Sequence, residues 1–300
     1  MIHKLREIPK KLRLAYKCIQ GPYFKWVGPG HFYSPLPDMG EIKRRELQIY
    51  GKPPAHLVGI NLSTEEQTRF LSEITRYASD MPFDRGHNPQ SRFTWPNGGA
   101  YPFQDAFVLY SMIRRYNPAR FVEVGCGYST CVTLDACQGL SLNTALTMIE
   151  PYPEWMQRSV KASDSSRYTF RQECIQDTPM NIFTDLAAND ILFIDTSHVS
   201  KTGSDVNHIF FNILPRLKPG VLVHFHDIFY PFEYPIDWLQ KGMFWNETYL
   251  LRAFLMHNSD FEIILFNNYI SQFHTEIVKN NFPQFLEDEP GTSLWIRRKL

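Results

Sequence analysis

From Phe121 onward, short apolar runs alternate with longer segments in which apolar residues recur every three or four positions. The short runs predict strands and the longer segments predict helices, and their alternation is typical of βαβ units on a parallel sheet. Because runs such as ILFI and VLV are apolar throughout, the strands should be covered on both faces. The predicted strands are residues 121–124, 145–150, 168–175, 190–195, 220–225, 261–266 and 292–298.

Between these strands the spacing of apolar residues predicts helices. The first hundred residues have a different pattern, with few periodic apolar runs. Glycine and proline turn signals dominate there, although Ser63 and Glu66 have capping-box spacing before an amphipathic segment. We predict an N-terminal extension of loops and helices over residues 1–99 and an α/β domain over residues 100–300. The domain should contain a seven-stranded, mostly parallel doubly wound sheet with a C-terminal antiparallel strand. The predicted helices are residues 102–116, 130–137, 153–161, 179–186, 205–217 and 247–256.

The composition and charge of the chain exclude some classes of binding partner. The 300 residues include 31 basic and 31 acidic side chains, so no overall field attracts nucleic acid. Five cysteines without metal-ligand or disulfide spacing favour a reducing cytoplasm. No apolar run reaches the roughly 18 residues needed to span a bilayer, so we expect a soluble cytoplasmic protein that acts on a small molecule. A homo-oligomer is left open.

The basic opening segment, residues 1–17, has scattered apolar residues. A surface helix touching acidic lipid is one interpretation, and a solvated or partner-docking arm is the other. Pro9 interrupts the helical pattern and favours the arm.

A glycine turn follows the first predicted strand of the domain in FVEVGCGYST. Gly125 and Gly127 let the backbone turn sharply and approach a ligand at the positive end of the following helix. Later strands end in acids, at Glu150 and Asp195, and Asp177 follows the third strand. Because the carboxyl ends of parallel strands border the ligand crevice, we expect these groups on one rim.

These motifs resemble those of the Rossmann-like, class I S-adenosylmethionine-dependent methyltransferases, and the resemblance covers residues 100–300. Glu123, Gly125 and Gly127 match the first three positions of the family's acidic-x-Gly-x-Gly-x-Gly motif, and Ser129 replaces the third glycine. The resemblance implies that this stretch faces the amino-acid part of S-adenosylmethionine. It also implies that Glu150 accepts hydrogen bonds from the ribose and that Asp177 lies near the adenine.

Histidines and aspartates gather after the fourth and fifth strands, at Asp195, His198, His224, His226 and Asp227. If the two strands are neighbours, these groups meet at one edge, with His224 one residue pair deeper. Carboxylates mixed with imidazoles suit manganese, iron or zinc, whereas magnesium favours oxygen ligands. The cluster resembles metal-dependent O-methyltransferases, which implies Asp195, His226 and Asp227 as metal ligands.

The leading hypothesis is therefore metal-assisted O-methylation of a small polar acceptor, with Asp195 in the catalytic set and His198 or His224 as the base. A metal-dependent lyase, aldolase or hydrolase on the same fold is the alternative, because histidines are more numerous than methyl transfer requires. A scaffold protein with an inactive fold is a third interpretation. His224 and His226 could also be neutral core residues.

Overall fold

The computed structural model describes residues 12–18, 20–23, 25–83, 91–94, 101–281 and 290–299. Two compact units share the chain: a smaller one of Met1–Pro53 and Ile236–Phe244, and a larger one of Pro54–Pro235 and Trp245–Leu300. The smaller unit holds α2 (Met39–Arg44), α3 (Glu46–Tyr50) and α10 (Ile236–Gln240). The boundary near residue 100 remains a prediction.

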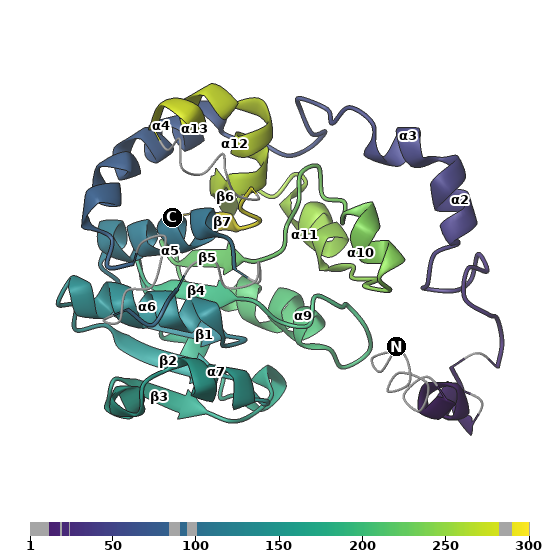
Figure 1. Ribbon diagram of the computed structural model, residues 1–300, viewed down its shortest axis with the longest axis horizontal. Coiled ribbons are helices and arrows are strands. Elements are labelled where there is room, and N and C mark those ends of the chain that lie inside the picture. Colours follow the sequence, from purple (N-terminus) through teal and green to yellow (C-terminus); the bar gives the residue numbers. More distant parts are fainter. Residues whose placement is uncertain are drawn as a thin grey trace, which may run out of the picture. The chain divides into compact units, whose positions relative to one another are not determined.

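The larger unit is built on one seven-stranded sheet in the order β3-β2-β1-β4-β5-β7-β6 (Figure 1). The strands β1 to β5 pair in parallel, and β7 runs antiparallel to both of its neighbours. This arrangement confirms the predicted fold class, and the antiparallel pair of β6 and β7 forms one edge of the sheet. The strands are β1 (Arg120–Val124), β2 (Ala145–Ile149), β3 (Tyr168–Arg171), β4 (Ile191–Ile194), β5 (Leu222–Phe225), β6 (Phe261–Phe266) and β7 (Leu294–Arg298).

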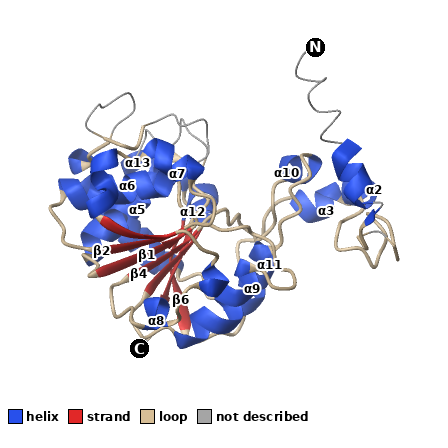
Figure 2. Cartoon of the chain, turned by 90° about the horizontal axis from the view of Figure 1, so that it is seen from below, coloured by secondary structure: helices blue, strands red, loops and turns tan. Residues whose placement is uncertain are grey.

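Helices cover both faces of the sheet, as the uninterrupted apolar strands predict (Figure 2). One face carries α5 (Phe103–Tyr116), α6 (Tyr128–Gly139), α7 (Glu154–Ser159) and α13 (Thr275–Asn281). The other carries α8 (Asn181–Thr184), α9 (Asp205–His208) and α11 (Glu247–Leu255). The remaining helical elements are α4 (Thr64–Ile74), α12 (Asn267–Phe273), η1 (Thr75–Asp80), η2 (Ala162–Ser166), η3 (Ile175–Asp177), η4 (Ile209–Ile213) and η5 (Leu214–Arg216).

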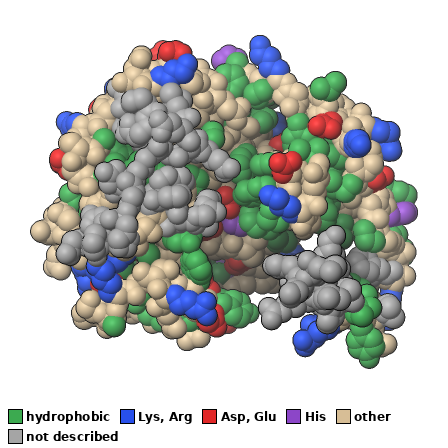
Figure 3. Space-filling model, in the orientation of Figure 1, with side chains coloured by type: hydrophobic (Ala, Val, Ile, Leu, Met, Phe, Trp, Pro, Cys, Tyr) green, Lys and Arg blue, Asp and Glu red, His purple; other side chains and the backbone are tan. Residues whose placement is uncertain are grey.

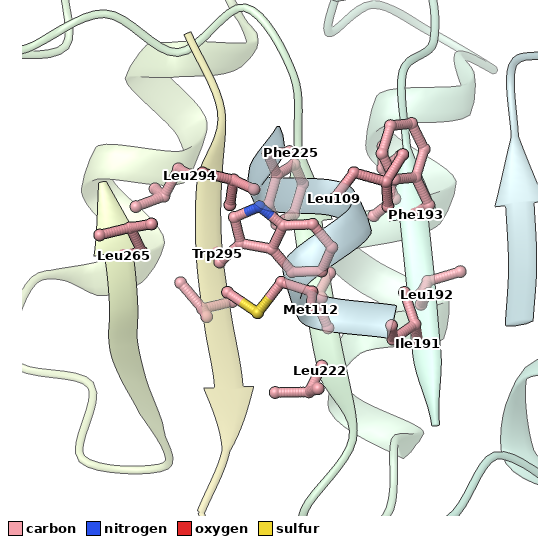
Figure 4. Close-up of a cluster of buried hydrophobic side chains, with 14 of the residues drawn as sticks. Leu109, Met112, Ile191, Leu192, Phe193, Leu222, Phe225, Leu265, Leu294 and Trp295 are labelled. Carbon is pink, nitrogen blue, oxygen red and sulfur yellow. The ribbon is translucent and has the colours of Figure 1, made fainter. Parts of the chain in front are cut away.

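The core lies where α5 packs on the middle strands (Figure 4). Trp295 of β7 and Phe193 of β4 are fully buried, and their rings meet edge to face at 6.5 Å. Every residue of α5 from Phe103 to Ile113 is buried, so this helix is enclosed on all sides. Polar side chains on such a helix require partners inside the protein.

Two local predictions need correction. The helix after Ser63 forms, but Ser63 has a left-handed φ of 48° and makes no side-chain cap, so the capping box is wrong. The Ser63 amide instead donates to Asn61 Oδ1 at 3.0 Å, which forms a local turn that competes with the cap. The single helix predicted for residues 205–217 is divided into α9, a π-helical segment and a final 3₁₀ turn.

A buried ion cluster joins the segment of residues 91–94 to α6 and η2 within the larger unit. The Arg92 guanidinium donates to both Asp135 of α6 and Asp164 of η2, with Nη1 to Asp135 Oδ1 and Nε to Asp164 Oδ2 each at 2.7 Å. All three side chains are at most 4% exposed. The backbone amides of Arg92 and Phe93 also donate to Asp135.

Replacing Arg92 with Ala should leave two buried carboxylates without their cation. Breaking a buried pair from one side costs about 3–5 kcal/mol, and urea unfolding would measure the loss. The matched control is Lys279→Ala, which removes an exposed pair with Glu276 and should cost below about 1 kcal/mol. Equal losses in the two variants would contradict a structural role for the Arg92 cluster.

Candidate active site

The glycine turn lies where β1 and its neighbour β4 end side by side. Gly125 has a φ of 83°, and a Cβ atom there would lie 1.6 Å from the carbonyl oxygen of Asp195. No side chain fits, so glycine is required by close backbone contact as well as by conformation. The strand order reverses at β1 and β4, which is where an open α/β sheet forms its ligand crevice.

Glu123 fixes the helix that follows the turn. Its buried carboxylate accepts hydrogen bonds from Ser129 Oγ at 2.5 Å and from Thr130 Oγ1 at 3.0 Å. Burial outweighs these two hydrogen bonds and raises the pKa of Glu123 to about 8. Thr130 Oγ1 also accepts from the amide of Gly127. Glu123 therefore holds the turn from inside, and Ser129 replaces the third glycine with a side chain that serves the same turn.

Two adjoining cavities open along this rim, with volumes of about 320 and 480 Å³. Gly125, Glu150 and Asp195 line both. Glu150 accepts from the amides of Cys126 at 3.2 Å and Tyr152 at 2.7 Å, which aligns its carboxylate at the end of β2. Three of the predicted rim groups thus converge, whereas the lining includes Gln176 but not the exposed Asp177.

His198 is the centre of the acidic cluster. Its Nε2 lies 3.2 Å from Asp195 Oδ1 and 3.6 Å from Asp227 Oδ2, and its Nδ1 lies 2.8 Å from Glu247 Oε2. The carbonyl oxygen of His198 accepts from the amides of Asn246 and Glu247 at the start of α11. The centroids of the Trp245 ring and the His198 imidazole are 4.4 Å apart. Both the backbone and the ring of His198 are therefore fixed.

The acids determine the charge state of His198. Burial lowers the pKa of His198, but hydrogen bonds to Asp195 and Glu247 outweigh burial and raise the pKa to about 10. Burial likewise opposes ionisation of Asp195, yet the charge of His226 and the hydrogen bond to His198 lower its pKa to about 2. Burial raises the pKa of Glu247 despite its bond to His198. With no cation present, His198 is an imidazolium held among carboxylates.

His226 is a second histidine beside the two aspartates, and it links them to Asp105 in the core. Its Nδ1 lies 3.4 Å from Asp227 Oδ1 and 3.8 Å from Asp195 Oδ1. Its Nε2 lies 3.5 Å from Asp105 Oδ2, and the ring stacks on Tyr101 with centroids 5.1 Å apart. His226 and His198 are each 3% exposed, so both imidazoles are buried against the two carboxylates.

His224 lies outside this group. Its side chain is fully buried and stacks on Phe193 with ring centroids 3.8 Å apart. Burial, together with the charge of His226, lowers the pKa of His224 to about 3, so the ring is neutral. Of the predicted base candidates, the structure brings His198 to the cluster and leaves His224 in the core.

The backbone at the cluster is strained. His198 and Asp227 have φ values of 56° and 57°, in the left-handed region that side chains disfavour. Such conformations persist where the surroundings fix them, and they concentrate at functional sites. Acidic and histidine side chains are visible near the middle of the face shown in Figure 3.

Sequence reasoning missed Asp105, Glu247 and Thr292. Asp105 is enclosed on α5 and accepts from Asn267 Nδ2 at 2.6 Å and from the amide of Thr292 at 2.8 Å. Thr292 Oγ1 donates to Asp227 Oδ1 at 3.2 Å. The available signal was an aspartate inside the apolar helix FQDAFVLYSMI. Glu247 gave no signal, because an acid in the first turn of a helix is ordinary.

Comparisons with known proteins agree with this architecture. A family model described as a methyltransferase domain matches residues 122–228. An uncharacterised protein of Archaeoglobus fulgidus is 31% identical over 192 residues, which make up 62% of this chain and 86% of that protein. The fold and the glycine turn define an open α/β protein with a ligand crevice where β1 and β4 end. Over residues 122–228, which include the glycine turn, Asp195 and Asp227, the chain matches the methyltransferase-domain family.

Solved structures with a similar fold are more distant. The apo-structure of CmcI is 15% identical with a TM-score of 0.43, over 75% of this chain and 84% of that one. The Podospora anserina methyltransferase PaMTH1 is 14% identical with a TM-score of 0.44, over 88% and 97% of the two chains. TomG of Streptomyces achromogenes, an O-methyltransferase, is 14% identical with a TM-score of 0.39, over 77% and 90%. At these scores, none of them informs the activity of this chain.

The charge state of His198 gives a prediction about pH. A histidine with a folded pKa of about 10 and an unfolded pKa of 6.5 stabilises the protein fully below pH 6.5 and loses this contribution as the pH rises toward 10. In chelator-treated protein, the difference in unfolding free energy between wild type and His198→Gln should shrink across this range. Urea unfolding at several pH values measures it, and a constant difference would contradict the charged state.

Proposed function

We propose that this protein is an S-adenosylmethionine-dependent O-methyltransferase that acts on a small polar acceptor with the help of a divalent cation. One observation carries the proposal: Asp195 lines both cavities of the glycine-turn rim and also faces His198 at 3.2 Å. A methyl donor in the cavities would therefore lie next to the acidic cluster. The match of residues 122–228 to a methyltransferase-domain family supports the choice of donor.

The rim suits the cofactor in shape and in chemistry. Gly125 and Gly127 leave backbone exposed to the cavity before the start of α6, where a carboxylate is favoured. Each oxygen of Glu150 accepts one backbone hydrogen bond and keeps a second lone pair for a ribose hydroxyl. The exposed ring of Trp155 lines the smaller cavity beside Tyr128 and offers a flat apolar wall.

Asp195, His198 and Asp227 suit a divalent cation. One ligand atom from each lies within 4.8 Å of the others, and in the part of the chain that the structure describes these three form the one such group. Mixed carboxylate and imidazole donors favour manganese, iron or zinc. Glu247 holds His198 Nδ1, so Nε2 is the nitrogen directed at the two aspartates. Carboxylates that orient a ligating histidine in this way are typical of metal sites.

Charge balance supports the same conclusion. Asp105, Asp195, Asp227 and Glu247 contribute four carboxylates, and His198 and His226 contribute two imidazoles within 4 Å of them. Even if both imidazoles are protonated, the four carboxylates carry more negative charge than the two rings carry positive charge, and the cluster is largely buried. Such a surplus is costly unless a cation offsets it. Relative to the prediction, His198 takes the ligand position in place of His226, which contacts both aspartates and Asp105.

Each residue of the site has a separate role in the proposed methyl transfer. When bound, S-adenosylmethionine supplies the activated methyl group, and a divalent cation lowers the pKa of the acceptor hydroxyl. Gly125 admits the donor beside Asp195, while Asp195 and Asp227 would hold the cation that binds the acceptor oxygen on the same rim. As the bond from the methyl carbon to sulfur breaks and its bond to oxygen forms, the proton of the acceptor hydroxyl leaves to water in the open cavity. Glu247 and His226 keep these groups oriented, which reduces the entropic cost of bringing donor and acceptor together.

A side chain at position 125 should prevent the cofactor from lying close to the backbone of the glycine turn and should abolish its binding. In titration calorimetry, wild type should bind S-adenosylhomocysteine, and Gly125→Ala should show no detectable heat. Glu150→Gln is the milder variant and should bind roughly tenfold more weakly, because one charged hydrogen-bond partner is lost. Gly242→Ala, at a glycine of similar φ with open space around it, is the control. A wild type that gives no heat would refute the proposed function.

Removal of the metal should stop methyl transfer, and the added cation should restore it. Glu247→Gln keeps a hydrogen-bond acceptor for His198 but removes the charge, so metal affinity should fall about 10-fold to 100-fold. Metal titration monitored by calorimetry or elemental analysis would measure this. Glu276→Gln, on the surface, should leave it unchanged. Tight metal binding without cofactor binding would favour the lyase or hydrolase alternative.

A further inference from the structure

The smaller unit of the chain has almost no core of its own. Among its described residues, Leu239 is the one buried hydrophobic side chain, at 9% exposed. Neither α2 nor α3 buries any residue. Large apolar side chains instead face outward, at Leu12, Leu14, Tyr16, Tyr23, Trp26, Phe32, Tyr33 and Leu47. An apolar surface of this kind marks an interaction site.

Its most exposed aromatic side chains are contiguous. Trp26 and Tyr33 stack with ring centroids 4.9 Å apart, Phe32 lies 4.3 Å from Tyr33, and His31 stacks on Phe32 at 4.2 Å. We call these four residues the aromatic loop. Trp26 is 76% exposed, and Phe32 is 80% exposed. The rings pack on each other and leave their outer surfaces in water.

Basic residues adjoin the aromatic loop. A cavity of about 280 Å³ is lined by His31 and Phe32 of the loop and by residues of α2, α3 and their junction, which include Arg45 and its ion-pair partner Glu41. Lys43 and Arg44, in the last turn of α2, are exposed. The loop therefore adjoins α2, and the last turn of that helix is basic.

Charge is divided unequally between the two units. The smaller unit carries twelve of the 31 basic residues and five of the 31 acidic ones, a net charge of +7, so the larger unit carries −7. The overall neutrality of the chain therefore conceals a strongly basic part. Such a part is attracted to an anionic surface.

We propose that the aromatic loop and the basic end of α2 dock the protein on the surface of a membrane that contains anionic lipid. Tryptophan and tyrosine rings favour the headgroup level of a bilayer, because one end of each ring is apolar and the other is polar. Lysine and arginine beside them are attracted to acidic headgroups. Docking of this kind needs no span, and no helix in the described residues is long and apolar enough to cross a bilayer.

Co-sedimentation with vesicles tests this docking. Full-length protein should sediment with phosphatidylcholine vesicles that contain phosphatidylglycerol, remain in solution with phosphatidylcholine alone, and be released by high salt. Trp26→Ala with Phe32→Ala should weaken partitioning by roughly tenfold or more, because two apolar groups no longer leave water. Lys43→Glu with Arg44→Glu should do the same by removing charge attraction.

A matched double variant on the larger unit provides the control. Phe211→Ala with Lys218→Glu removes a 61% exposed aromatic ring and an exposed cation there, and it should sediment like wild type. Circular dichroism and cofactor calorimetry should be unchanged in all variants, which keeps this test separate from methyl transfer. Wild type that ignores anionic vesicles would overturn the proposal. So would a vesicle-independent dimer, seen by light scattering, that the Trp26 and Phe32 substitutions dissociate.

Discussion

The contact between the backbones of Gly125 and Asp195 is the constraint on which the site depends. The amide of Asp195 donates to the carbonyl of Val124 at 2.9 Å, which continues the β1–β4 ladder one residue beyond the strands. Gly125 turns away at that point, and its missing side chain lets the two chains touch. The Asp195 carboxylate therefore stands at the border between the cofactor rim and the acidic cluster. Both halves of the proposed reaction meet at this one side chain.

The cluster around His198 illustrates how a buried polar group is tolerated. Three carboxylates surround the imidazole, and the largest unfavourable effect on its charge is burial. Hydrogen bonds from both ring nitrogens offset that effect, and a cation would offset the remaining negative charge. The same contacts hold the ring in one orientation. Stability and function thus depend on the same interactions, which is common where strained backbone and perturbed pKa values coincide.

Glu123 shows how a motif residue can shape the glycine turn from inside the core. Its carboxylate is fully buried and bonds the hydroxyls of Ser129 and Thr130, so it shapes the turn that lines the cavity. Ser129 departs from the family's glycine pattern, and the departure is explained by this bond. Asp105 has a comparable role under the histidines, because it fixes the chain at Thr292 and contacts His226.

The sequence by itself determined the sheet, the glycine turn and the meeting of Asp195 with Asp227. These features follow from apolar periodicity and from the rule that parallel strands end at one edge, which are properties of local pattern. Tertiary structure alone decided that Glu247 pairs with His198 Nδ1 and that Asp105 binds the amide of Thr292 and contacts His226. These contacts join residues up to 187 positions apart, and their geometry depends on how α5, α11 and β7 pack on the sheet. No periodicity along the chain records such packing.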